Sequence, residues 1–400
     1  MNINGTLYLD YQASTPIDPR VLSEMEPYWH DSFGNPHAAN HSIGWRAAKA
    51  VDSARERVAQ MIGAAPDEII FTSGATEANN LAILGLARGR SDANRHRILV
   101  SAIEHSCVLQ AAHASSRQLG FSVELLPVQS DGSIDLEFLS HTLNQDVLLV
   151  SVMVVNNEIG TIQDISSIVK TVSDSNAYFH CDAAQAPTAL NLTQLAEMVD
   201  LISLSGHKMY GPQGVGALYI RRELQQEVEP LFYGGGQQAG LRSGTIPLPL
   251  VSGMAKAAEL IASPDIDRER KRIQQMRDRF VSSLQASIHN LALNGPSFSK
   301  RHPGNANLRF PGVTAENLLL ALQPRLAAST GAACSTGIPL PSHVLKAIGL
   351  NTEEAAASIR FSFGRFTEDT HIDEAIELIT SKYTGLLGNR EFRPADVATD

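Results

Sequence analysis

One lysine of this chain lies in a setting suited to covalent chemistry. Lys208 follows a short apolar run at 200–204 that is typical of a strand, and Ser205 and His207 lie beside it. Most lysines are solvated surface charges, but a lysine at a strand end is placed where side chains converge. An amine in that position can form an imine with an aldehyde, as in pyridoxal phosphate (PLP) enzymes. An ordinary structural turn is the alternative interpretation.

The partners of such a lysine would come from the segment just before it. Asp182 ends the strand-like run 178–182, and Gln185 follows three residues later. A buried carboxylate is costly unless it meets a cation, and the protonated pyridine nitrogen of PLP is such a cation. Gln185 could then hydrogen-bond the phenolate oxygen of the ring. The alternative role of Asp182 is to cap the segment that follows it.

A phosphate site is indicated earlier in the chain. A strand-like run at 68–72 leads into the small-residue turn 73–76, which opens a helix-like segment at 77–86. Such a turn presents free backbone N–H groups and the positive end of the helix dipole to a phosphate. Ala75 lies in this turn, and Thr76 adds a hydroxyl, although Thr76 is equally suited to be an ordinary N-cap. Further candidate donors beside the lysine are Ser205 and His207.

Taken together, these motifs resemble those of the cysteine desulfurases, PLP enzymes of the class V aminotransferase superfamily. The matching stretches run nearly from end to end, and their order and spacing make the resemblance very specific. They are Tyr8-Leu9-Asp10-Tyr11, Gly34-Asn35-Pro36-His37, Thr72-Ser73-Gly74-Ala75-Thr76-Glu77, Glu104-His105, Val155-Asn156-Asn157-Glu158-Ile159-Gly160, Asp182 with Gln185, the segment Ser205 to Pro212, Arg242-Ser243-Gly244-Thr245, and Ser358-Ile359-Arg360 with Gly364-Arg365.

The resemblance implies a role for each matching position around the cofactor. Lys208 would hold PLP covalently, Asp182 would pair with the pyridine nitrogen, and Gln185 would pair with the phenolate oxygen. His105 would stack on the ring and take part in proton transfer. The phosphate would be held by Ala75, Thr76, Ser205 and His207.

The resemblance also implies how substrate and a second subunit are engaged. Arg360 and Asn157 would bind the substrate carboxylate, with Asn35 as a further helper. Thr245 would reach the phosphate of the cofactor in the neighbouring subunit, which implies a homodimer with shared sites. Read without the family, His105 is a satisfied core histidine and Arg360 belongs to a surface ion pair.

Cys334 is the residue that would distinguish a desulfurase from other PLP enzymes. It lies among Ala, Ser, Thr and Gly residues between 329 and 337, a composition that favours mobility over packing. Cys107 and Cys181 instead fall in apolar surroundings, which predicts buried structural thiols. A desulfurase needs a thiolate that takes the sulfur of the bound cysteine and carries it as a persulfide. The resemblance gives that role to Cys334.

The surroundings of Cys334 resemble the group I desulfurases, in which a helix start follows the cysteine segment. Here that start is Pro341-Ser342-His343, and the Arg-x-Gly-His-His-Cys signature of group II is absent from the sequence. The sequence around Cys334 departs from the usual group I pattern at Ala332-Ala333 and at Ile338-Pro339-Leu340. Pro339 and Pro341 each fix a backbone φ angle, which would shorten the reach of the segment. The choice of sulfur acceptor is therefore left open.

Composition restricts the class of protein. The chain has 400 residues, 43% of them hydrophobic, which is ordinary for a globular protein with two or three domains. A net charge of −10 disfavours direct nucleic-acid binding. Three cysteines indicate a reducing compartment, and with no sequence resembling a signal peptide this predicts a cytoplasmic protein. The longest apolar run, Val147–Val155, is too short to span a membrane and predicts one buried parallel strand.

The order of strand-like and helix-like segments predicts an α/β protein with a mainly parallel sheet in the large domain and a smaller α+β domain. The resemblance implies that this is PLP fold type I. We expect the large domain at 15–260, and the small domain at 1–14 and 261–400. The small domain would bring Arg360 and Cys334 to the cofactor. Strands are predicted at Ile98–Ala102, Val147–Val155, Tyr178–Asp182, Asp200–Leu204, Ala306–Phe310, Ala327–Thr330 and Ser358–Phe363, and helices at Arg268–Ala286, Ala315–Leu322 and Ile372–Tyr383, before a polar tail from Gly388.

The function expected from the resemblance is conversion of L-cysteine to L-alanine, with sulfur left on Cys334 for an acceptor protein. Desulfurases of this type serve iron–sulfur cluster assembly, tRNA thiolation or DNA phosphorothioation, and the sequence does not choose among them. No metal site is expected. The alternatives are a selenocysteine lyase or other PLP β-lyase, and a non-catalytic scaffold for sulfur transfer.

Overall fold

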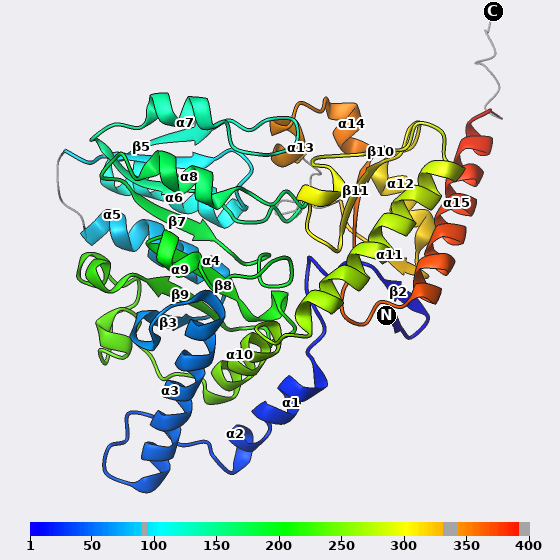
Figure 1. The fold of residues 1–400 in the computed structure, drawn as a ribbon. Coiled ribbons are helices and arrows are strands. Elements are labelled where there is room, and N and C mark those ends of the chain that lie inside the picture. Colours follow the sequence, from blue (N-terminus) through cyan, green and yellow to red (C-terminus); the bar gives the residue numbers. More distant parts are fainter. Residues whose placement is uncertain (90–93, 331–341, 392–400) are drawn as a thin grey trace, which may run out of the picture.

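The computed structural model describes residues 1–89, 94–330 and 342–391, and a seven-stranded sheet forms its centre (Figure 1). Five neighbouring strands are parallel, whereas β9 runs antiparallel to both of its neighbours. The carboxyl ends of the parallel strands therefore meet at one edge of the sheet. In spatial order the strands are β3 (Ile69–Thr72), β9 (Gly216–Ile220), β8 (Leu201–Ser205), β7 (Tyr178–Asp182), β6 (Val147–Ser151), β4 (Arg97–Ser101) and β5 (Ser122–Leu126).

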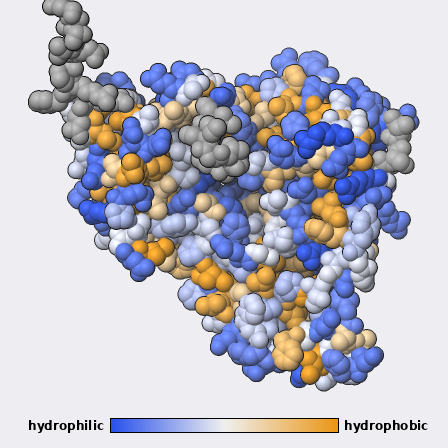
Figure 2. All heavy atoms as spheres, turned by 180° about the vertical axis from the view of Figure 1, so that it is seen from behind, coloured by the Kyte–Doolittle hydropathy of each residue, from blue (hydrophilic) through white to orange (hydrophobic). Residues whose placement is uncertain are grey.

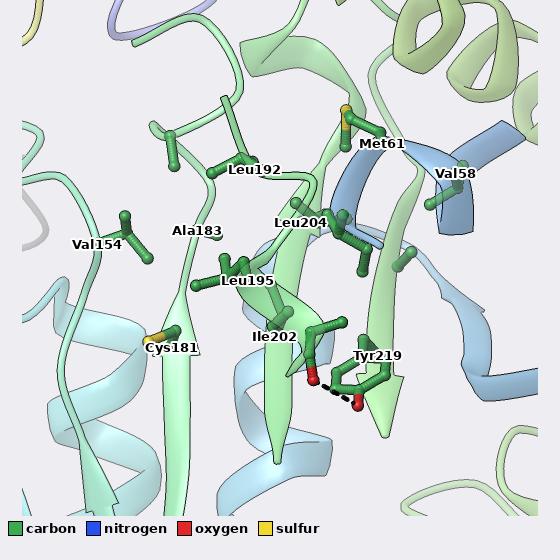
Figure 3. Packing of buried hydrophobic residues seen from close by; sticks show 14 of the residues in the cluster. Val58, Met61, Val154, Cys181, Ala183, Leu192, Leu195, Ile202, Leu204 and Tyr219 are labelled. Carbon is green, nitrogen blue, oxygen red and sulfur yellow. Dashed lines mark hydrogen bonds between the residues drawn. The ribbon is translucent and has the colours of Figure 1, made fainter. Parts of the chain in front are cut away.

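Alternation along the strands separates two hydrophobic clusters, one on each face of the sheet. Leu99 and Ile202 belong to one cluster, whereas Ile98 and Leu201 belong to the other, as the two-residue period of a strand requires. Figure 3 shows the first cluster, where the Tyr219 hydroxyl donates to the backbone oxygen of Ala196. This face is covered by α3 (Ser42–Ile62), α7 (Leu136–Thr142), α8 (Ile165–Val172), α9 (Leu195–Met198) and α10 (Leu248–Ile261), and the other by α4 (Ala75–Asn80), the π-helical turn η2 (Leu81–Gly85), α5 (Leu86–Gly89) and α6 (Ser106–Leu119).

The predicted strand Val147–Val155 is wrong in its second half. Strand β6 ends at Ser151, and the chain then bends away from the regular ladder. The cause is a buried side chain: the backbone N–H of Met153 donates to a carboxyl oxygen of Glu104 at 2.5 Å. Val152 and Val154 still bond to the backbone oxygens of β7 residues His180 and Asp182.

A second, smaller part of the structure packs beside the large sheet, on the right in Figure 1. Its strands form two three-stranded sheets, and β2 near the amino terminus pairs in parallel with β12. Phe280, Phe361 and Phe363 stack in its core. The division at residue 260 stays a prediction. The elements are β10 (Ala292–Leu293), β11 (Asn305–Arg309) and β13 (Ser358–Ser362), then β1 (Asn2–Ile3), β2 (Thr6–Tyr8) and β12 (Leu326–Ala327), with α11 (Ile266–Ser287), α12 (Ala315–Leu322), α13 (His343–Ala347), α14 (Thr352–Ala356) and α15 (Asp369–Glu391).

An arginine with a largely covered side chain ties these two parts together. The guanidinium of Arg365 lies 2.7 Å from the carboxylate of Asp18 and 2.8 Å from that of Glu269, and it covers the ring of Tyr210 at 4.2 Å. Asp18 caps α1 (Pro19–Met25), which leads into α2 (Pro27–His30). The start of the chain is thereby fixed against the segment that follows β13.

Most of the surface is hydrophilic, but the view in Figure 2 also shows apolar areas on the lobe at the lower right. The lobe corresponds to α2 and the start of α3 in Figure 1. The exposed aromatic side chains of this region include Trp29, Phe33 and Trp45, each at least 60% accessible. Within the described ranges, no helix is long and apolar enough to cross a membrane.

Candidate functional site

A cavity of about 650 Å³ opens at the carboxyl edge of the sheet, and residues from many strand ends line it. The turn after β3, the residue before α6, the end of β7 and the turn after β8 all contribute, and β13 reaches in from the smaller part. The structure thus brings together residues that are far apart in sequence. The predicted site residues in its wall are Ala75, Thr76, His105, Asn157, Asp182, Gln185, Ser205, His207, Lys208 and Arg360.

The amine of Lys208 is held by backbone oxygens. It donates to Gln12 at 2.6 Å and to Ala13 at 2.7 Å, and the single turn η3 (Gly206–Lys208) carries it directly after β8. Burial, and then the positive charge of Arg360, lower the pKa of Lys208 to about 8. Such an amine loses its proton more easily than a surface lysine does, which suits both covalent and proton-transfer chemistry.

Asp182 is buried at the end of β7, and its carboxylate is held by two donors. The side-chain nitrogen of Asn79 donates to one oxygen at 2.8 Å, and the backbone N–H of Ala184 donates to the other at 2.8 Å. Among the described residues, no cationic side chain lies within ion-pair distance of it. The Ala184 contact shows that Asp182 does cap the next segment, yet its place in the cavity wall leaves it facing a possible ligand cation.

The predicted phosphate turn lies at the start of α4. Gly74 is the N-cap with φ of +152°, and Glu77 accepts the backbone N–H of Ser73. The turn lies so close to β9 that a Cβ atom at Gly216 would be 2.6 Å from the Cα atom of Gly74. The missing side chain of Gly216 therefore allows the close approach that fixes the turn against the sheet.

Two further predicted phosphate donors follow β8. The side chain of His207 lies 3.2 Å from the hydroxyl of Ser14, and Ser205 is buried in the cavity wall. Burial, with the neighbouring Lys208 as the second cause, lowers the pKa of His207 to about 4. His207 is therefore neutral at physiological pH and offers one N–H donor. Gln185 uses its own amide N–H to bind the backbone oxygen of Gln12.

Arg360 enters from β13 and is buried, so the predicted alternative of a surface ion pair is wrong. Its guanidinium bonds to the carboxylate of Asp10 at 2.7 Å and to the backbone oxygen of Asn157 at 2.7 Å. Its Nε atom is buried and has no partner in the part of the chain that the structure describes. A guanidinium with a spare donor beside the cavity suits recognition of a carboxylate.

Cys107 is not the buried structural thiol that its neighbours in sequence predict. It is only partly buried, lines the cavity, and lies 3.0 Å from the ring of His105. It is the second residue of α6, and its thiol faces His105, the N-cap of that helix. Cys181 is fully buried, as expected.

Two buried acids fasten α13 to the cavity wall. The hydroxyl of Ser342, which caps α13, donates to Glu158 at 2.5 Å, and the ring of His343 lies 2.9 Å from the backbone oxygen of Glu104. Burial raises the pKa of both carboxyl groups, that of Glu104 well above its ordinary value. The helix start predicted at Ser342 and His343 is confirmed.

Two predicted residues lie elsewhere. Asn35 and Thr245 are exposed and do not line the cavity of this single chain, so their roles stay predictions. Cys334 lies outside the described residues. Within the described part of the chain, no group of His, Cys, Asp or Glu side chains is arranged to hold a metal ion.

Sequence reasoning missed the residues that support the predicted ones. Asp10, Asn79 and Glu104 act through partners 49 or more positions away in the chain. Cys107 was assigned by its apolar neighbours, although its spacing of two from His105 could have indicated a contact. Glu104 directly precedes His105 in the Glu-His motif, and this position could likewise have indicated a supporting role at the site.

These residues fit PLP. The cavity volume is in the range of small-ligand pockets, and its wall presents a buried carboxylate for which no described residue supplies a cationic partner. Backbone N–H groups at the start of α4 and the hydroxyls of Thr76 and Ser205 are donors suited to a phosphate. Lys208 supplies the amine. PLP would contribute an aldehyde carbon and an electron-withdrawing pyridinium ring at this site.

Comparison with known proteins gives concordant findings. A sequence model of the aminotransferase class-V family matches residues 7–374. The chain is 46% identical to cysteine desulfurase IscS of Rickettsia rickettsii over 381 residues, which covers 95% of this chain and 92% of that protein. A solved structure of a NifS-like protein superposes with a TM-score of 0.88 at 32% identity, covering 95% of this chain and all of the other. SspA in complex with cysteine gives 0.78 at 36% identity, covering 91% and 100%.

The buried acids Glu104 and Glu77 should affect folding stability with opposite dependence on pH. Burial raises the pKa of Glu104 well above its ordinary value, so it keeps its proton to a higher pH in the folded protein than in the unfolded chain, where glutamate ionises above about pH 4.3. The contribution of Glu104 to folding stability therefore falls as pH rises. The free energy of unfolding of Glu104→Gln should increase relative to that of wild type between pH 4.5 and pH 8.

Glu77 is the matched control for this test. Burial acts to raise its pKa, but hydrogen bonds from Arg242 and Ser73 prevail and lower it. Its stabilising effect is present above the unfolded pKa and is lost as pH falls, so Glu77→Gln should cost about 1.5–3 kcal/mol at pH 7 and less at pH 4. Urea unfolding at both pH values measures both variants. Equal pH dependence of the two would contradict these assignments.

The charges around Lys208 should shift its pKa in opposite directions when they are removed. Arg360 lowers this pKa and Asp10 raises it. Arg360→Met should therefore raise the pKa of Lys208 above about 8, and Asp10→Asn should lower it. Competitive labelling of the cofactor-free protein with a trace of acetic anhydride, read by mass spectrometry across pH, measures the midpoint. Shifts of the same sign in both variants would refute this arrangement of charges.

Proposed function

Because this chain belongs to the aminotransferase class-V family and, within it, to the cysteine desulfurases, we propose that it converts L-cysteine to L-alanine and leaves the sulfur on Cys334. The observation that carries the proposal is the cavity that unites Lys208, Asp182 and Arg360 at the edge of the sheet. An amine, a carboxylate without a cationic side-chain partner and a guanidinium are the groups that a PLP-dependent reaction of an amino acid requires.

The cofactor of this family is pyridoxal 5′-phosphate. Lys208 would hold it, and Asp182 would keep its pyridine nitrogen protonated, with Gln185 beside the phenolate oxygen. The phosphate would lie against the backbone of the 73–76 turn and the side chains of Thr76, Ser205 and His207. Each of these groups lines the same cavity, which supports the assignment.

Residues of this chain would bind the substrate and move its protons. The α-carboxylate of cysteine would bind Arg360, whose buried Nε atom lacks a partner among the described residues, with Asn157 next to it. Lys208, with a pKa of about 8, would take the proton from Cα and return a proton later. His105 would exchange a proton with the substrate sulfur from the cavity wall.

The sulfur step balances without an added oxidant. The thiolate of Cys334 attacks the substrate sulfur, a sulfur–sulfur bond forms and the bond from sulfur to Cβ breaks. The electron pair of that bond, with protons from the site, completes the methyl group of alanine. One cysteine and one protein thiol thus yield one alanine and one persulfide.

We further propose a homodimer in the cytoplasm that passes its sulfur to an acceptor protein. The aromatic side chains of Trp29, Phe33 and Trp45 are exposed in the single chain, which supports association with a second copy. Thr245 is exposed, as a residue that reaches into a neighbouring subunit must be. Iron–sulfur assembly, tRNA thiolation and DNA phosphorothioation remain the candidate destinations.

Two variants test the proposed reaction. Lys208→Ala should lower alanine formation by roughly 10²- to 10⁴-fold or more, because loss of the proton-transfer role by itself has an effect of that size. Cys334→Ser should still bind cysteine, since Lys208 and Arg360 are intact, but should release little alanine or sulfide. Cys181→Ser is the control, because its buried thiol is remote from solvent. Alanine is measured by chromatography and the persulfide by mass spectrometry. Wild-type turnover in Cys334→Ser would instead indicate a β-lyase.

A further inference from the structure

Cys107 and His105 form a contact that the proposed reaction does not account for. The thiol sulfur of Cys107 lies 3.0 Å from Nδ1 of His105, and the backbone N–H of Cys107 reaches the same ring nitrogen at 3.2 Å. Both residues line the cavity. The question is which group holds the hydrogen at each point of this contact.

The backbone decides the state of Nδ1. A backbone N–H can only donate, so Nδ1 of His105 accepts and carries no proton. The thiol is then the donor in the contact between Cys107 and His105, because two acceptors would repel each other at 3.0 Å. In a neutral ring the single proton therefore lies on Nε2, for which no described residue supplies a hydrogen-bond partner.

The other side of the thiol supports the same direction. Asn79 donates from one side-chain nitrogen to the carboxylate of Asp182 at 2.8 Å and to the sulfur of Cys107 at 3.2 Å. A carboxylate accepts only, which fixes the orientation of the amide. Hydrogen bonds thus run from Asn79 to Cys107 and from Cys107 to His105. The sulfur accepts on one side and donates on the other.

The ionisation of both groups agrees with this geometry. Burial, followed by the charge of Asp182, raises the pKa of the Cys107 thiol to about 12, so the sulfur keeps its hydrogen. Burial also lowers the pKa of His105, which keeps the ring neutral. The other groups that face His105 are Asp182, which opposes this effect, and Lys208 and His343, which add to it.

We propose that Cys107 is a positioning residue that holds His105 in the tautomer with its proton on Nε2, so that this imidazole meets the substrate as a hydrogen-bond donor. The inference rests on the proposed function for the identity of the substrate. It deepens that function by naming the direction of the hydrogen bond between His105 and the substrate sulfur. A neutral ring with its proton on Nε2 donates a hydrogen bond to the substrate sulfur, and it can gain a proton only at Nδ1.

The tautomer can be read in the resting holoenzyme, before any substrate is added. Protein labelled with ¹⁵N in its histidine rings is studied by solid-state NMR, and the His105→Gln spectrum identifies the signals of His105. We expect an unprotonated Nδ1 and a protonated Nε2 in wild type. A proton on Nδ1 in wild type would overturn the proposal, whether or not the enzyme turns over cysteine.

Substitutions at Cys107 separate a positioning role from simple packing. Cys107→Ala removes the S–H donor and should raise the proton affinity of His105 about three- to tenfold, the size of one lost hydrogen bond. Cys107→Ser keeps a donor and should restore the wild-type value and tautomer. If alanine and serine variants both match wild type, the thiol does not position the ring. If the alanine variant does not fold, the wild-type tautomer decides.

The state of the thiol is tested independently by infrared spectroscopy. The S–H stretching band that disappears in Cys107→Ser should lie below the frequency of a free thiol, as expected for a donor, and should move when His105 is changed to Gln. A difference spectrum without an S–H band would show a thiolate and contradict the proposal. Neither measurement depends on alanine formation, so failure of the tautomer and failure of the desulfurase reaction are distinguishable.

Discussion

The site depends on one carboxylate that is buried without a cation. Asp182 ends a central strand, receives hydrogen bonds from Asn79 and Ala184, and has no cationic side chain within ion-pair distance among the described residues. Removing such a group from water is costly unless a positive charge compensates it. A pyridinium nitrogen in the adjoining cavity would provide that charge, and the placement of Lys208 and of the phosphate turn follows from where the ring must then lie.

The other acids near the cavity have either a raised pKa or a cationic partner. Burial raises the pKa of Glu104 and Glu158, and both serve as hydrogen-bonding groups that hold the backbone of Met153 and the cap of α13. Asp10 is paired with Arg360. Glu104 and Glu158 thus hold elements next to the cavity in place, whereas Asp182 and Arg360 line the cavity itself.

Sequence reasoning predicted the parts of the site that depend on local order along the chain. Asp182 and Lys208 follow apolar runs that end in turns, and the parallel sheet then requires their strand ends to meet. It failed where a distant side chain decides. The strand expected to continue to Val155 stops because Glu104 binds Met153, and the thiol of Cys107 faces His105 because a helix starts between them. Asn35 and Thr245 cannot be placed at the cavity by one chain, and Cys334 lies outside the described residues.

The central claim is that Asp182 exists to keep a pyridine nitrogen protonated. The most direct test is ¹⁵N NMR of PLP labelled at its ring nitrogen and bound at neutral pH to wild type and to Asp182→Asn, an amide of nearly the same shape. The account predicts a proton-bearing nitrogen in wild type and loss of that proton in the variant. An unprotonated nitrogen in wild type, or equal protonation in both proteins, would contradict it.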